Sequence, residues 1–123
     1  DQPRGNEDKT WANSYATAFS NKAGKVTQLA LESYGCNLDK SSANQVSVRD
    51  RFSTLANLFT KTLFENEINL TDGEFKSLGP HTQKMPRVTI TRSLNSVKKI
   101  KLRTGFYKCD GHSGYGYRLD IFL

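Results

Sequence analysis

The first half of the chain repeats apolar residues at the spacing of a helix. Between Thr10 and about Tyr34 they recur every three to four residues, and Gly35 then follows as a helix-ending residue. This pattern predicts one helix, or two helices divided near Gly24. Its members are Trp11, Tyr15, Ala18, Phe19, Ala23, Val26 and Ala30.

A second apolar stripe follows a polar segment over residues 37–45. Ser47, with Asp50 three residues later, is typical of a helix start, because the serine side chain accepts a hydrogen bond from a backbone N–H of the first turn. The stripe predicts a helix from Ser47 onward, and it consists of Val48, Phe52, Leu55, Phe59 and Leu63.

After Pro86 the pattern changes to alternation, with β-branched and aromatic residues separated by polar ones. Alternation is the period of a strand with one buried face. The sequence therefore predicts strands at Arg87–Ser93, Val97–Lys108 and Tyr115–Leu123, and Ile68–Leu70 is a candidate for a fourth.

The first predicted hairpin has a definite register, because inward residues must face inward residues across a strand pair. Ser93 opposite Val97 leaves a three-residue turn, which is an allowed hairpin length. This register sets two apolar pairs across the strands, Val88 with Leu102 and Ile90 with Ile100.

The second predicted hairpin is aligned on its aromatic residues. Phe106 opposite Tyr117 leaves a loop from Cys109 to Gly114. The same register sets Arg103 opposite Asp120 on the outward side, which is a favourable opposite-charge pair.

Helices followed by an antiparallel sheet with one apolar face predict an α+β domain in two layers. We expect two or three N-terminal helices packed on one face of a C-terminal antiparallel sheet of three to four strands. The 123 residues suffice for one domain, which we place at residues 10–123 after a flexible arm over residues 1–9. No apolar run approaches the roughly 18–20 residues of a membrane span, so none is expected.

The net charge of +6 is concentrated in the C-terminal part of the chain. Residues 1–74 carry eight Lys and Arg against ten Asp and Glu, whereas residues 75–123 carry ten against two. A basic half favours attraction to an acidic protein, a nucleic acid or an anionic surface.

The two cysteines, Cys36 and Cys109, predict either one disulfide closing a long loop or two buried free thiols. A disulfide, together with a first residue that is not Met, leads us to expect an exported protein, periplasmic or extracellular. Cys36, His81, Cys109 and His112 are residue types that bind zinc, but they do not form the two close pairs of a structural site, and no metal or cofactor is expected.

The strand alternation that turns Ile100, Leu102 and Phe106 inward turns a row of cations outward. This row predicts an electrostatic docking face for an acidic protein; the alternative is a solvated surface that keeps the sheet soluble. The Gly-, Tyr- and Ser-rich segment after Gly111 is typical of adaptable contact surfaces. The expected partner-binding residues are Arg87, Lys99, Lys101, Arg103, Tyr107, His112, Tyr115 and Tyr117.

The two histidines, His81 and His112, suggest an alternative in which the protein is a small basic ribonuclease toxin. One imidazole would act as base and the other as acid, with a Lys or Arg stabilising the phosphorane. No nucleotide-binding or hydrolase motif is present. We therefore expect a small exported binding protein without catalysis, such as an inhibitor or a bacteriocin-type immunity protein. Nucleic acid is a less favoured partner, because few aromatic residues are predicted to interleave with the cations.

Overall fold

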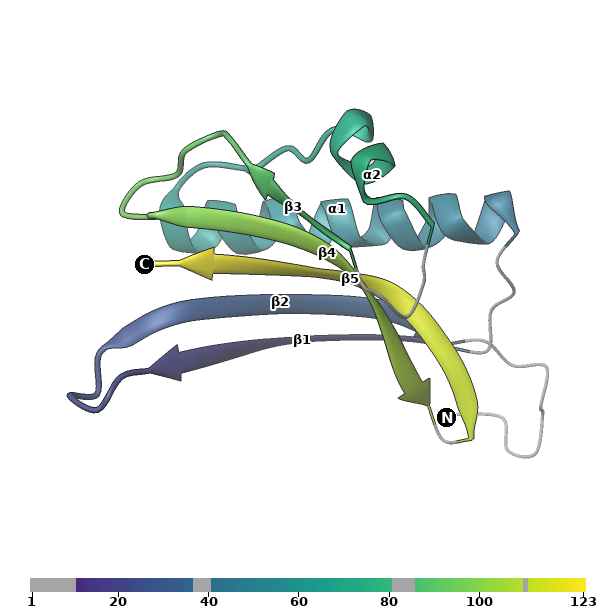
Figure 1. Cartoon of the computed structure of the whole chain (residues 1–123), viewed down its shortest axis with the longest axis horizontal. Helices are drawn as coiled ribbons and strands as arrows, with labels where there is room; N and C mark the ends of the chain where they lie inside the picture. The colour runs from purple at the N-terminus through teal and green to yellow at the C-terminus, as the bar shows by residue number, and fades with distance from the viewer. Residues whose placement is uncertain (1–10, 37–40, 81–85, 110) are drawn as a thin grey trace.

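Strands open and close the chain, with helices between them. The computed structural model describes residues 11–36, 41–80, 86–109 and 111–123. These residues form the following elements, which are labelled in Figure 1: β1 (Trp11–Ser20), β2 (Val26–Cys36), α1 (Ser42–Phe64), α2 (Asp72–Leu78), β3 (Arg87–Ile90), β4 (Lys99–Cys109) and β5 (His112–Phe122).

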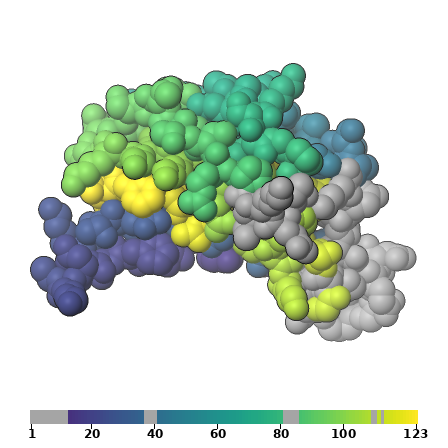
Figure 2. Space-filling model, in the orientation of Figure 1, coloured from purple at the N-terminus to yellow at the C-terminus, as the bar shows by residue number. Residues whose placement is uncertain are grey.

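One antiparallel sheet contains the five strands, in the order β1-β2-β5-β4-β3. The N-terminal hairpin therefore extends the C-terminal sheet through pairing of β2 with β5. Both helices lie on one side of this sheet, α1 over β2 and β5 and α2 against β3, and the tip of the β1–β2 hairpin projects beyond them (Figures 1 and 2). The α+β class with an antiparallel sheet is confirmed, with five strands and two helices in the described residues.

The prediction of helices over residues 10–34 is wrong, because this segment forms the β1–β2 hairpin. In β1 the larger side chains Tyr15 and Phe19 share one face, and the small Ala16 and Ala18 share the other. The alanines coincided with a helical spacing and hid this alternation. Neither described helix covers β1, and its side chains from residue 13 to residue 20 are exposed.

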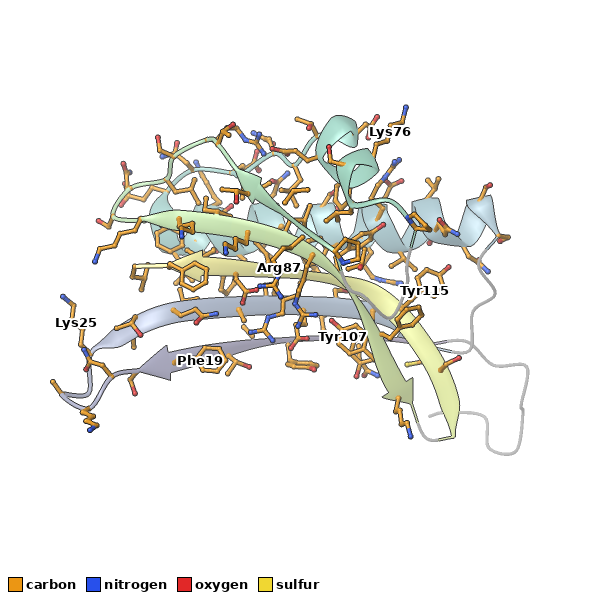
Figure 3. All side chains as sticks on the ribbon, in the orientation of Figure 1. Phe19, Lys25, Lys76, Arg87, Tyr107 and Tyr115 are labelled. Carbon is orange, nitrogen blue, oxygen red and sulfur yellow. The ribbon has the colours of Figure 1, made fainter. Side chains whose placement is uncertain are left out.

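Local hydrogen bonds explain why the chain turns between the two strands. The Oδ1 atom of Asn21 accepts hydrogen bonds from the backbone N–H groups of Ala23 and Lys25, at 2.9 and 3.0 Å. Gly24 has a φ of +83°, a conformation that glycine adopts without steric cost. Figure 3 shows Lys25 at this turn and Phe19 on β1 beside it.

The helix predicted from Ser47 is present, but it starts earlier, at Ser42. Ser41 is the residue whose side chain accepts the first-turn hydrogen bond, from the N–H of Asn44 at 3.3 Å. Glu65, at a φ of 66°, ends the helix. The buried residues recur every fourth position and point at the sheet: Val48, Phe52, Ala56, Thr60 and Phe64.

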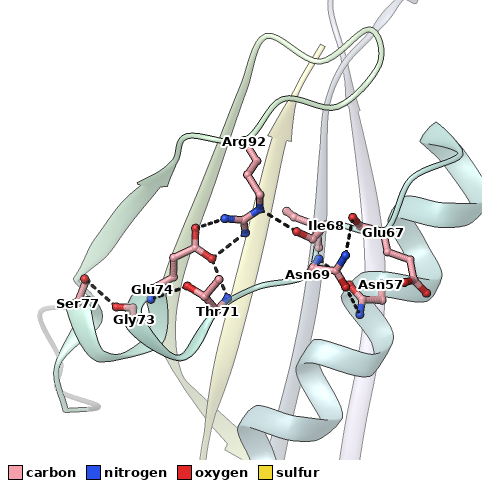
Figure 4. A network of polar contacts seen from close by, with 9 residues as sticks. All are labelled: Asn57, Glu67, Ile68, Asn69, Thr71, Gly73, Glu74, Ser77 and Arg92. Atoms are coloured by element: carbon pink, nitrogen blue, oxygen red, sulfur yellow. Dashed lines mark hydrogen bonds and ion pairs between the residues drawn. The ribbon is translucent and has the colours of Figure 1, made fainter.

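The strand predicted at Ile68–Leu70 is wrong, because this segment is an irregular connection between α1 and α2. The hydrogen bonds of Arg92 to Glu74 and Ile68, called the polar clamp below, hold the connection in place (Figure 4). Arg92 donates two hydrogen bonds to the Glu74 carboxylate, at 2.6 and 2.7 Å, and a third to the carbonyl of Ile68 at 2.9 Å. The N–H of Ile68 donates to the Thr60 hydroxyl at 3.0 Å. Both backbone polar groups of Ile68 are thus satisfied by side chains, so the segment needs no strand partner.

Glu74 also stabilises the first turn of α2, because it forms a reciprocal pair of hydrogen bonds with Thr71, the residue before the helix. Burial opposes ionisation of this carboxyl group. The hydrogen bonds from Arg92 and from the Thr71 N–H outweigh that effect and hold the pKa of Glu74 below its usual value. Arg92 therefore has a permanently charged partner at neutral pH.

The hydrophobic core lies between the helices and the facing side of the sheet. Leu31, Leu119 and Leu102 form one row across neighbouring strands, and the last two are fully buried. Phe52 of α1 and Phe75 of α2 cover this side, with 0% and 7% of their surface exposed. The sheet face away from the helices is called the outer face below.

The two apolar pairs of the first predicted C-terminal register are confirmed, because Val88 faces Leu102 and Ile90 faces Ile100. The three-residue turn predicted between Ser93 and Val97 is wrong, since β3 ends at Ile90 and β4 begins at Lys99. The second predicted register is wrong by two residues, because Phe106 faces Tyr115. Cys109 pairs with His112, which leaves only two residues between the strands, and Gly111 has a φ of +86°. A two-residue turn ending in glycine is a favoured hairpin connection that the predicted six-residue loop overlooked.

This shift changes the predicted pairing of charges. Arg103 faces Arg118, and Lys101 takes the position opposite Asp120. Asp120 is nonetheless neutralised by Arg118 of its own strand, through a hydrogen bond of 2.9 Å. The predicted Arg103–Asp120 pair is therefore replaced.

Two facing glycines, Gly105 and Gly116, make room on the outer face of the β4–β5 hairpin. A Cβ atom on Gly116 would lie 2.0 Å from the Ser33 carbonyl oxygen, and one on Gly105 would lie 2.6 Å from the Tyr107 hydroxyl. Beyond these glycines the hairpin curls away from the helical layer (Figure 1). Glycine is required where strands bend and neighbouring groups approach this closely.

Candidate docking surface

The outer face is organised in rows, because residues directly opposite one another in an antiparallel sheet point to the same side. One row crosses the whole sheet and begins with a tyrosine and a glutamate. Three arginines from adjacent strands complete it. The members are Tyr15, Glu32, Arg118, Arg103 and Arg87.

The basic patch consists of Arg87, Lys99, Lys101 and Arg103 on β3 and β4. Arg87 and Lys99 are exposed, and Lys101 and Arg103 are half-buried. Arg103 donates a hydrogen bond to the carbonyl of Thr104 at 3.3 Å. The structure thus brings together the four cations that the sequence placed on one side of the sheet.

Two buried carboxylates lie beside the patch and are already satisfied. Glu32 and Asp120 are each 9% exposed. Asp120 accepts hydrogen bonds from Arg118 and from Gln28, both at 2.9 Å, and Arg118 also lies 3.9 Å from Glu32. The charge of Arg118 is therefore balanced by these carboxylates, and the excess positive charge of the outer face lies in the basic patch.

Tyr107 belongs to this network and is not a free contact residue. Its hydroxyl donates to Glu32 at 3.0 Å, and its ring stacks on Tyr34 with 4.0 Å between the centroids. Burial, reinforced by the charge of Glu32, raises the pKa of Tyr107 well above its usual value. Tyr107 thus remains a neutral hydrogen-bond donor, lying beside the N-terminal hairpin (Figure 3).

Two exposed aromatic rings on the outer face were missed by the sequence analysis. Tyr15 and Phe19, both on β1, are 46% and 41% exposed. Phe19 lies 6.0 Å from the guanidinium of Arg118, and Tyr15 lies edge-on to Tyr34 at 6.2 Å. Alternation of Tyr15, Thr17 and Phe19 was the available signal, but the helical prediction obscured it.

Tyr115 and Tyr117 do not lie on the outer face. They belong to the core, with 2% and 6% of their surface exposed, and Tyr117 packs against Phe52 and Phe75. Burial raises the pKa of Tyr117 to about 12, although Arg49 acts in the opposite direction. Neither tyrosine is placed to contact a partner, because alternate residues of β5 face the helices.

The histidines and cysteines of the predicted sites are only partly described by the structure. His81 and the side chain of His112 lie outside the described residues, so the ribonuclease pair stays a prediction. Cys36 is fully buried, and no described cysteine is a free thiol. The side chain of Cys109 is not described, so the Cys36–Cys109 disulfide also stays a prediction.

The described residues contain neither a candidate metal cluster nor a helix that could cross a membrane. No group of three or more His, Cys, Asp and Glu side chains among them is arranged to hold a metal ion. Neither described helix is long and apolar enough to cross a membrane.

Comparisons with known proteins add no assignment. No protein family, curated protein or solved structure matches this chain.

Proposed function

We propose that this protein is a non-catalytic binding module whose outer face docks to an acidic surface of another protein. An inhibitor or a bacteriocin-type immunity protein would act in this way. The observation that supports the proposal is the basic patch, in which Arg87, Lys99 and Lys101 form no ion pair with any described residue.

The spacing of the patch suits long-range attraction. Residues two apart on a strand lie about 6.7 Å from each other, and adjacent strands lie about 4.8 Å apart. Both distances are below the Debye length of about 8 Å at physiological salt, so the charges act together on an approaching partner. Such a field raises association rates about tenfold or more, and salt weakens the effect.

The arrangement of rings and cations favours a protein over a single-stranded nucleic acid. Tyr15 and Phe19 lie on β1, roughly 14 Å from β4 across the sheet. The carboxylates of Glu32 and Asp120 lie on the strands between them. A nucleic acid that stacked on these rings and reached the patch would cross two carboxylates that share a single arginine, Arg118, whereas a protein interface combines separate aromatic and charged areas.

The proposal is tested by binding of a fluorescent glutamate-rich peptide, measured by anisotropy across a series of salt concentrations. We expect the variant Lys99→Gln/Lys101→Gln to bind several-fold more weakly than the wild type, with a flatter salt dependence. The matched control is Lys22→Gln/Lys25→Gln, which removes the same charge at the hairpin turn and should bind like the wild type.

Other outcomes would contradict the proposal. Equal weakening in both double variants would mean that total charge, and not the basic patch, attracts the peptide. Tighter binding of an oligothymidylate than of the peptide would favour nucleic acid as the partner. Cleavage of RNA that is lost in His112→Ala would show that the protein is catalytic.

Export to an oxidising compartment is part of the same proposal, because it rests on the predicted disulfide. On the chain-entropy model, a bond between Cys36 and Cys109 would contribute about 4 kcal/mol of stability. Alkylation of the denatured, unreduced protein followed by mass measurement is expected to find no free thiol. Two modified thiols in freshly isolated protein would contradict export.

A further inference from the structure

β1 is an unprotected sheet edge. It is the last strand at one end of the sheet, and no described strand pairs with its free edge. In an antiparallel strand alternate residues direct their N–H and C=O groups away from the partner, so about half of its ten residues offer both groups to a further strand. Such an edge readily accepts another chain.

The usual protection against edge pairing is missing along most of β1. None of its ten residues, Trp11–Ser20, is charged or proline. A register irregularity falls only at Phe19 and Ser20, near the end of the strand. The opposite edge differs, because β3 has four residues and begins with an exposed arginine.

The helix side of β1 is also uncovered. Ala16 lies beside Leu31 of β2, and above Leu31 is an apolar cavity of about 290 Å³ between α1 and the sheet. Leu58 and Leu63 of α1 border this cavity and are 64% and 49% exposed. Apolar surface therefore adjoins the strand that neighbours β1.

We propose that β1 pairs with β1 of a second copy, antiparallel and about a two-fold axis, to form one sheet of ten strands. A two-fold contact needs a surface that complements itself, and an uncharged strand meets this condition. Antiparallel pairing places the two hairpin turns, which carry Lys22 and Lys25, at opposite ends of the contact.

The positions of the other cations also permit this contact. In the dimer the two β4 strands would be seven strand spacings apart, or roughly 34 Å. This distance is several Debye lengths at physiological salt, so repulsion between the two basic patches is largely screened. An acidic partner, in contrast, would find no cation along β1.

The size of the contact predicts a weak dimer. One strand edge and two adjoining leucines per copy form a smaller contact than the 20–30 residues per partner of a standard interface. We therefore expect a dissociation constant of about micromolar to tens of micromolar. Both basic patches would face the same side of the joined sheet, available to a partner with two acidic sites.

The test is sedimentation velocity over a concentration series from micromolar to millimolar, with Thr17→Lys as the disrupting variant. Thr17 and Thr89 are exposed and belong to the same row on opposite sheet edges, so Thr89→Lys is a matched control. Because the contact is two-fold symmetric, it would contain two new lysines, one from each copy. Their charges repel each other, so Thr17→Lys should weaken the dimer about tenfold. Thr89→Lys should leave it unchanged.

Circular dichroism checks that each variant is folded, and Ala16→Lys provides a second disruption on the other face of β1. Amide exchange supplies an independent readout, because the outward N–H groups of β1 should become protected as the wild type is concentrated. A monomer throughout the series overturns the proposal. So does a dimer weakened equally by Thr17→Lys and Thr89→Lys, or one whose formation leaves β1 amides unprotected.

Discussion

The space above Gly105 on the outer face is occupied by the ring of Tyr107, and this leads to a prediction about stability. A Cβ atom on Gly105 would lie 2.6 Å from the Tyr107 hydroxyl and 2.9 Å from two ring carbons. The ring is held in place by its hydrogen bond to Glu32 and by its stacking on Tyr34. Gly105→Ala must therefore displace a ring that has two other attachments.

The expected change in stability is the steric cost of the added methyl group less the gain from replacing glycine by alanine. Overpacking by one methyl group costs about 1–3 kcal/mol where the neighbour is fixed. Alanine in a strand interior is otherwise about 0.5–1 kcal/mol more favourable than glycine. Gly105→Ala should thus destabilise the wild type by about 1–2 kcal/mol, yet stabilise a Tyr107→Ala background by about 0.5 kcal/mol.

Urea unfolding of the wild type, both single variants and the double variant gives the coupling energy between the two positions. We expect a coupling of about 2 kcal/mol, well above the few tenths seen for independent sites. Gly73→Ala is a control, because its Cβ would meet only the Thr71 hydroxyl oxygen, at 3.9 Å, and it should not destabilise the protein. An equal cost of Gly105→Ala in both backgrounds would refute the reasoning.

Three further predictions concern the fold. In urea unfolding, Gly116→Ala should destabilise the protein by more than Gly105→Ala does. Its Cβ would lie 2.0 Å from the Ser33 carbonyl oxygen, and a backbone group cannot rotate away as a side chain can. An equal or smaller cost would be evidence against the close approach of β5 to β2. Because the folded-state pKa of Glu74 is lowered, its clamp with Arg92 stabilises above the unfolded pKa and loses that contribution as pH falls through the folded value. Glu74→Gln should therefore flatten the acid side of the stability profile, and an unchanged profile would contradict this. The pKa of Tyr117 is raised to about 12, so stability should fall as pH rises from about 10 through 12. The tyrosinate absorbance should show a step near pH 12 that Tyr117→Phe removes.

The C-terminal strands were predicted well from the sequence, because each buries only one face of the sheet and its apolar residues therefore alternate with polar ones. Val88, Ile90, Ile100 and Leu102 alternate with polar residues, and this alternation determined both the strands and the first register. The basic patch followed from the same alternation. The second register was not predictable from the aromatic residues, because Phe106 can face either Tyr115 or Tyr117 with both rings inward, and the two-residue connection before His112 selects Tyr115.

The N-terminal hairpin was not predictable from burial, because β1 buries neither face. Its small residues Ser14, Ala16 and Ala18 gave no strand signal, and they matched a helical spacing by coincidence. The consequence for the candidate site is direct. Tyr15 and Phe19 join the outer face only when this segment is a strand, so both exposed rings were absent from the predicted surface.

The most direct test of the docking surface is to map a bound acidic ligand onto the sheet. Backbone amide shifts of the labelled protein would be followed during titration with the glutamate-rich peptide. We expect the perturbed amides to cluster at Arg87, Thr89, Lys99 and Lys101, and those along α1 to stay unchanged. Perturbations centred on the helices, or binding that leaves β3 and β4 unaffected, would contradict the proposed docking surface.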